Sequence, residues 1–82
     1  MVKETYTIYI LKCCDKSLYT GITNDLEKRL SDHALGKGSK YVRSRLPFKL
    51  IYSEQAPSKS EALKRECAIK ELTRDEKIAL VS

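Results

Sequence analysis

The stretch TIYILKCCDKSLYTGITNDLEKRLSDH, residues 7–33, decides the fold. Residues 5–13 and 18–23 are rich in β-branched and aromatic side chains, which favour strands. The four residues between them, CDKS, are typical of a turn that joins two antiparallel strands. The stretch therefore predicts a β-hairpin at its beginning.

A helix is predicted directly after the hairpin. Asn24 and Glu27 have the spacing of a capping box, and Gly36 is typical of the position just beyond a helix C-terminus. We therefore expect a helix that ends at about Leu35. Residues 36–45 are then a basic loop with room for one helical turn.

The second half of the chain predicts one strand and two helices. FKLIYSE at 48–54 has strand character. A helix is expected from Ser58 or Ser60 to about Leu72, and a short last helix at 74–81. The order β-β-α-β-α-α predicts a single α/β domain over all 82 residues, an α+β sandwich of helices on a three-stranded antiparallel sheet.

The composition, 41% hydrophobic and 33% charged, is that of an ordinary water-soluble domain. No apolar run approaches the roughly 20 residues of a membrane-spanning helix, and the first residues, MVKET, lack the apolar region of a secretory signal. The three cysteines include no CxxC pair, and one histidine completes no zinc pattern. We therefore expect a cytoplasmic monomer with reduced thiols and no membrane partner.

A basic segment follows the first predicted helix. The formal net charge is +5, yet no acidic residue occurs between His33 and Ser53. The cations of this segment are Lys37, Lys40, Arg43, Arg45 and Lys49. Such a segment indicates a polyanionic partner, with phosphates as the obvious ligand. The alternative is a solvated loop with a chance surplus of lysine.

Glu66 is the most unusual residue of the 60–72 helix, because it falls in the middle of the apolar face. On a wheel of about 100° per residue, that face is formed by Ala62, Leu63, Ile69 and Leu72. An ionised carboxylate that faces a core costs several kcal/mol without a partner. Glu66 therefore meets a buried arginine, lies at the edge of the face, or binds a metal at the floor of a cleft.

Five further residues depart from a plain core pattern. His33 lies in the apolar stripe of the first helix, one turn after Arg29. Tyr9 and Tyr19 lie in the hairpin strands, and Gly21 indicates a bulge or the close approach of a ligand or of backbone. Each has a structural explanation, such as a satisfied core histidine or a half-buried tyrosine. Together they indicate one polar site beside the basic segment.

Five ordered segments of the chain resemble the GIY-YIG nuclease superfamily. TIY at 7–9 and YTG at 19–21 resemble its two signature motifs, and DLEKRLSDH at 25–33 resembles the helix that follows them. SEALKRECAIKEL at 60–72 resembles the helix that carries a metal-binding glutamate. SLYTGIT, GKGSKY and PFKLIYSE-like stretches make the chain most similar to the short stand-alone bacterial proteins of the UPF0213 type.

The resemblance implies hydrolysis of nucleic-acid phosphodiester bonds with one divalent ion, Mg²⁺ or Mn²⁺, and without an organic cofactor. We expect DNA rather than RNA as the partner. The residues that the resemblance places at the site are Tyr9 and Tyr19 as signature tyrosines, Arg29 as catalytic arginine, His33 as a catalytic histidine and Glu66 as metal ligand. Nucleic-acid contacts are expected from Lys37, Lys40, Tyr41, Arg43 and Arg45.

The chain also departs from the family pattern. Thr7 replaces the first glycine of the signature and Thr20 its isoleucine. No asparagine follows the 60–72 helix, where larger members carry one. A catalytically weak or inactive nucleic-acid-binding module is therefore one alternative to a nuclease, and a protein-interaction adaptor is another.

Overall fold

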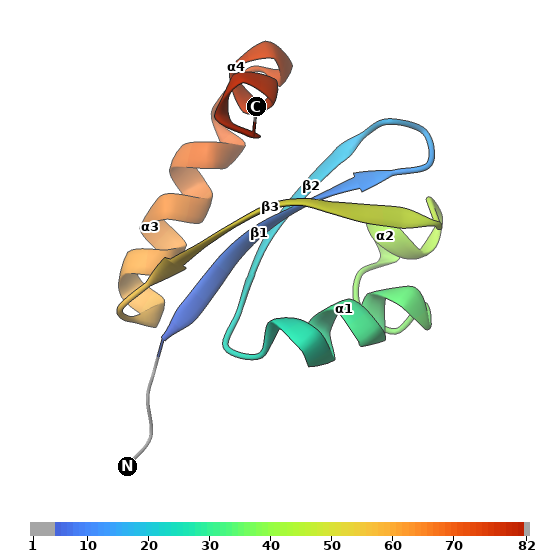
Figure 1. The fold of residues 1–82 in the computed structure, drawn as a ribbon, viewed down its shortest axis with the longest axis horizontal. Coiled ribbons are helices and arrows are strands. Elements are labelled where there is room, and N and C mark those ends of the chain that lie inside the picture. The colour runs from blue at the N-terminus through green and yellow to red at the C-terminus, as the bar shows by residue number, and fades with distance from the viewer. Residues whose placement is uncertain (1–4, 82) are drawn as a thin grey trace.

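The computed structural model of the protein describes residues 5–81 and confirms the predicted α+β fold (Figure 1). Its elements, in chain order, are β1 (Tyr6–Cys13), β2 (Leu18–Thr23), α1 (Leu26–Ala34), α2 (Lys40–Arg43), β3 (Phe48–Ala56), α3 (Lys59–Lys70) and α4 (Arg74–Val81). α2 is the helical turn expected within the basic segment. Within the described residues, no helix is long and apolar enough to cross a membrane.

The three strands form one antiparallel sheet in the order β2-β1-β3, so the first strand is central. The hairpin register pairs Tyr9 with Gly21 and Ile10 with Thr20. Side chains alternate between the two faces of a strand, so Ile8 and Ile10 face one side of β1 and Tyr9 faces the other.

The sheet carries a separate apolar core on each face. On one face, α3 packs through Ala62 and Ile69 against Ile8 and Ile10. On the other face, residues of α1 and α2 pack around Tyr9 and its neighbours. Each fully buried aliphatic side chain contributes about 1.5–3 kcal/mol to the free energy of unfolding. Figure 1 shows α1 and α3 separated by the strands, so a site that uses both helices must draw on both faces.

The N-cap of the first helix differs from the prediction, whereas the glycine at its C-terminal end agrees with it. Asp25, not Asn24, is the N-cap, and its carboxylate accepts a hydrogen bond from the Lys28 amide at 3.2 Å. Both residue types cap well, so the sequence could not separate neighbours. Gly36 lies just beyond the helix with φ of +78°, which is the left-handed conformation expected there.

The apolar face of α3 is narrower than predicted. Leu63 is 45% exposed, whereas Ala62 and Ile69 are fully buried. Ala62 and Ile69 are seven residues apart and point in nearly the same direction, whereas the side chain of Leu63 points about 100° away from that of Ala62. The helix also begins after a Ser58 cap and ends at Lys70, two residues earlier than expected.

Candidate functional site

Tyr9 and His33 form the buried centre of the site. Both are fully buried, and the Tyr9 Oη and His33 Nε2 atoms lie 3.0 Å apart. Burial raises the pKa of the Tyr9 phenol. Burial, followed by the nearby charge of Arg29, lowers the pKa of His33. The pair is therefore a neutral phenol beside a neutral imidazole near pH 7.

Aromatic rings enclose this pair. Tyr19 lies edge-on to His33, with ring centroids 5.6 Å apart, and tilted against Tyr9 at 6.4 Å. Tyr41 stacks on Tyr19 at 5.9 Å, and Phe48 meets the edge of His33 at 6.0 Å. Aromatic pairs of this kind add about 0.5–1.5 kcal/mol each beyond their buried area. The sequence predicted two of these tyrosines, from separate strands, at one site.

Arg29 brings a fixed positive charge to the same place. A hydrogen bond with Tyr9 raises the pKa of the Arg29 guanidinium, although burial opposes the shift. Its Nε atom is buried and has no hydrogen-bond partner within residues 5–81. A buried donor without a partner costs about 1–3 kcal/mol. The site therefore offers a donor and a charge that an anion can satisfy.

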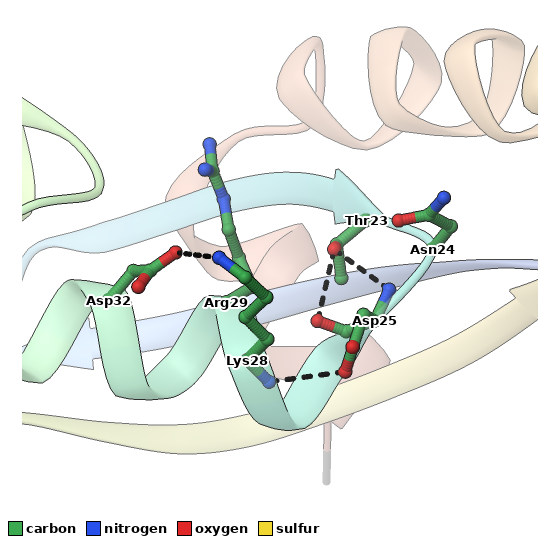
Figure 2. Close-up of a pocket in the computed structure, with 6 residues that line it drawn as sticks. All are labelled: Thr23, Asn24, Asp25, Lys28, Arg29 and Asp32. Atoms are coloured by element: carbon green, nitrogen blue, oxygen red, sulfur yellow. Dashed lines mark hydrogen bonds and ion pairs between the residues drawn. The ribbon is translucent and has the colours of Figure 1, made fainter.

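A pocket of about 270 Å³ lies beside Arg29 at the start of α1. Its other lining residues are Thr23, Asn24, Asp25, Lys28 and Asp32. Figure 2 shows the guanidinium end of Arg29 pointing away from Asp25 and Lys28. Lys28 pairs with Asp32 at 3.2 Å, whereas Arg29 makes no ion pair with any residue from 5 to 81.

Glu66 lies on α3, which packs on the opposite face of the sheet from α1. Its side chain is 19% exposed and pairs with Lys70 at 3.5 Å. Burial is the largest cause that raises the pKa of Tyr9, and the charges of Tyr19 and then Glu66 raise it further, whereas Arg29 lowers it. Glu66 therefore lies within electrostatic reach of the phenol. It is half-buried and paired with a lysine of its own helix, and not with the buried arginine considered from the sequence.

The single carboxylate of Glu66 suits a magnesium ion that is bound mainly through water. No group of three or more His, Cys, Asp or Glu side chains converges on a metal position in the described part of the chain. Mg²⁺ keeps several of its waters and is commonly held by one or two carboxylates plus substrate phosphates. The single carboxylate of Glu66 fits that requirement, whereas it does not fit a zinc site.

Two glycines let the backbone approach the central pair. A Cβ atom on Gly21 would lie 2.6 Å from the Tyr9 hydroxyl, so this glycine makes the close approach that the sequence indicated. A Cβ atom on Gly38 would lie 2.7 Å from His33 Cε1 and closer still to Nδ1. The sequence reasoning missed Gly38. Its signal was the second glycine of GKGSKY, directly after the helix that carries His33.

The cations of the basic segment fall into two groups. Lys37, Lys40, Arg43 and Lys49 are exposed and make no ion pair with any described residue. Arg45, from which a phosphate contact was also expected, forms an ion pair instead of standing free: its Nε donates to Asp15 at 3.0 Å, and its guanidinium lies 3.9 Å from the centre of the Tyr41 ring. The partner is 30 residues away in the chain, so no local pattern could reveal it.

The chain is similar to proteins of a known family. The GIY-YIG catalytic domain matches residues 5–79. The UPF0213 protein OB0043 of Oceanobacillus iheyensis is 51% identical over 78 residues, which cover 95% of this chain and 91% of that protein. The UPF0213 protein CPE1444 of Clostridium perfringens is 56% identical over 75 residues, 92% of this chain and 81% of that protein.

Two solved structures are also similar to this chain. The solution NMR structure of the UPF0213 protein BH0048 from Bacillus halodurans superposes with a TM-score of 0.62 at 47% identity, covering 94% of this chain and 82% of that one. The solution NMR structure of EF2693 from E. faecalis gives a TM-score of 0.64 at 42% identity, covering 92% and 80%.

Proposed function

The chain belongs to the GIY-YIG catalytic-domain family, in its UPF0213 group, and from this membership we propose that it hydrolyses phosphodiester bonds of nucleic acid with one divalent cation. The observation that carries the proposal is the guanidinium of Arg29, whose buried Nε has no hydrogen-bond partner in the described part of the chain and lies beside the Tyr9–His33 pair. A fixed cation with an unused donor suits a phosphate oxygen.

Arg29 stabilises the charge that develops during hydrolysis. When water attacks a phosphodiester, negative charge builds on the phosphoryl oxygens and on the leaving oxygen. A guanidinium that is already held in a partly dry site stabilises such charge without further reorganisation. Its hydrogen bonding to Tyr9 keeps the arginine beside the group that handles the proton.

Tyr9 and His33 form a relay for the proton of the attacking water. The raised pKa of Tyr9 makes the phenol a poor base by itself. His33 is neutral because its pKa is lowered, so its Nε2 can accept the phenol proton across the 3.0 Å hydrogen bond. As Tyr9 takes a proton from the water, it passes its own proton to His33, and no charge is left on the phenol.

Glu66 is the residue that would hold the cation. A bound Mg²⁺ or Mn²⁺ would supply Lewis-acid stabilisation of the leaving oxygen. The half-buried position of the Glu66 carboxylate restricts its rotamers and orients it. Lys70 provides the same carboxylate with positive charge from the next turn of the helix.

Substrate binding falls to the exposed cations Lys37, Lys40 and Arg43, which line the segment between α1 and β3. Phosphate contacts of this kind position a strand without reading its sequence. We therefore expect binding that is strongly salt-dependent and tolerant of sequence, with DNA as the favoured substrate.

A binding module without catalysis is the second candidate. One observation favours it, because no asparagine occurs after α3, and Asn24 is the only asparagine in the chain. The fold and the basic segment would then serve nucleic-acid binding alone.

Incubation with labelled DNA and RNA of several structures, with Mg²⁺ or Mn²⁺ and with a chelator, separates the two. The nuclease predicts cleavage that the chelator stops and that Arg29→Ala abolishes while the variant still binds. Salt-dependent binding of the parent protein with no cleavage under any of these conditions would establish the binding module instead.

A further inference from the structure

Arg45 is held in place by groups on two separate segments. Its Nε donates to Asp15 Oδ2 at 3.0 Å, and its Nη1 donates to the Tyr41 carbonyl at 3.1 Å and to Ser44 Oγ at 3.0 Å. The guanidinium carbon lies 3.9 Å from the centre of the Tyr41 ring. A planar guanidinium can make the fork of hydrogen bonds and the stacking contact at the same time.

Asp15 is itself fixed within the turn of the β1–β2 hairpin. Its Oδ1 accepts hydrogen bonds from the Ser17 amide at 3.0 Å and the Ser17 hydroxyl at 2.5 Å. These bonds, and then Arg45, lower the pKa of Asp15 and keep it ionised. A backbone bond from the Cys14 amide to the Arg45 carbonyl, at 3.1 Å, joins the same two segments.

The stack continues from Arg45 into the candidate site. Tyr41 stacks on Tyr19, with centroids 5.9 Å apart and an angle of 29° between the rings. Tyr19 in turn lies 5.6 Å from the His33 ring and 6.4 Å from the Tyr9 ring. A continuous run of contacts therefore leads from the hairpin turn to the proton-relay pair.

We propose that Asp15 and Arg45 form a clamp that holds Tyr41 against Tyr19, and thereby fixes the Tyr19 ring beside Tyr9 and His33. Arg45 is then a positioning residue for the site and not a phosphate ligand. The kinetic part of this inference rests on the proposed nuclease function, whereas the structural part does not.

The charge of Arg45 separates the two roles. Asp15 neutralises it locally, so the pair contributes little net attraction to a phosphate backbone. A phosphate ligand would be replaced by lysine with modest loss, because the charge is kept. A clamp would not be rescued, because lysine lacks the planar fork and stacks poorly.

The kinetic test compares Arg45→Ala, Arg45→Lys and Asp15→Asn in cleavage of labelled DNA. We expect kcat to fall roughly 10- to 100-fold in all three, since small misplacements at a site have effects of this size, while KM stays close to that of the parent. Arg43→Ala should raise KM instead, and Lys64→Ala, on the exposed face of α3, should change neither. Full kcat in Arg45→Lys, or a rise in KM alone in Arg45→Ala, would overturn the clamp.

A second measurement does not depend on catalysis. NMR spectra of protein with labelled tyrosine rings and isoleucine methyls should show the Tyr19 ring resonances shifted in Arg45→Ala and Arg45→Lys. The Ile69 methyls, in the core on the other face, should stay where they are. If the parent protein cleaves no nucleic acid, the proposed function fails and this comparison alone decides the clamp. Tyr19 resonances that stay unchanged in both variants would overturn it.

Discussion

Replacing Gly38 with alanine should destabilise the protein through one ring, that of His33. A Cβ atom at this position would lie 2.7 Å from His33 Cε1 and 2.9 Å from Cγ, where ordinary contacts are 3.4–4 Å. The imidazole would have to retreat by about 1 Å to regain a favourable separation. It cannot do so freely, because its Nε2 is hydrogen-bonded to Tyr9 and its other sides are packed against aromatic rings.

The expected cost follows from overpacking a buried site. Forced shifts of this kind cost about 1–3 kcal/mol, and the reduced entropy of the unfolded chain returns about 0.4–1 kcal/mol for glycine to alanine. We expect Gly38→Ala to lower the free energy of unfolding by about 1–2 kcal/mol and the melting temperature by roughly 4–16 °C for a domain of this size.

A double-mutant cycle with His33→Ala tests the cause. Without the ring there is nothing for the new methyl group to meet, so Gly38→Ala should cost little in the His33→Ala background. Gly36→Ala is the matched control, because its penalty comes from the φ of +78° and should be the same in both backgrounds. Chemical denaturation measures all of these variants. An equal penalty for Gly38→Ala with and without the ring would refute the reasoning.

Three further outcomes are expected. Folding lowers the pKa of His33, so the unfolded chain binds the proton more readily. The stability that is present above the unfolded pKa of 6.5 should therefore be lost as the pH falls from about 7 to about 5. Urea denaturation should show a smaller loss in His33→Gln, and equal losses would contradict the prediction. Replacing Lys40 and Arg43 together with alanine should flatten the salt dependence of DNA binding by about one unit per lost contact; an unchanged slope in fluorescence anisotropy would remove them from the binding surface. Arg65→Ala breaks the ion pair with Glu54, in which the Arg65 side chain is 42% exposed and the Glu54 side chain 25% exposed. Denaturation should therefore show that the free energy of unfolding falls by roughly 1 kcal/mol or less, and a fall several times larger would contradict the prediction.

The elements could be predicted because their signals are local. β-branched and aromatic runs gave the strands, and the glycine at position 36 marked the end of the first helix, where the structure has the left-handed conformation. The errors have two different causes. Neighbouring Asn24 and Asp25 are equally good caps, and the exposure of Leu63 depends on how α3 sits on the sheet.

The site was only partly predictable, because its decisive contacts join distant segments. The pattern violations at Tyr9, Tyr19 and His33 identified rings that do cluster. The ion pair of Arg45 depends on a carboxylate 30 residues away. The role of Gly38 is a shorter-range case, because it depends on how the His33 ring, five residues earlier, is placed against the glycine.

A paired measurement on Glu66→Gln, with Glu61→Gln as the matched control, decides whether this protein is a metal-dependent nuclease. Both glutamates lie on α3 and pair with a lysine, Glu66 with Lys70 and Glu61 with Lys64. Because each lysine is largely exposed, each pair is worth roughly 0–1 kcal/mol, so both variants should melt close to the parent protein. We predict that Glu66→Gln loses Mg²⁺-dependent DNA cleavage while Glu61→Gln keeps it. A Glu66→Gln protein that melts several degrees lower, yet cuts DNA as well as its parent, would contradict the assignment of Glu66 as the metal ligand.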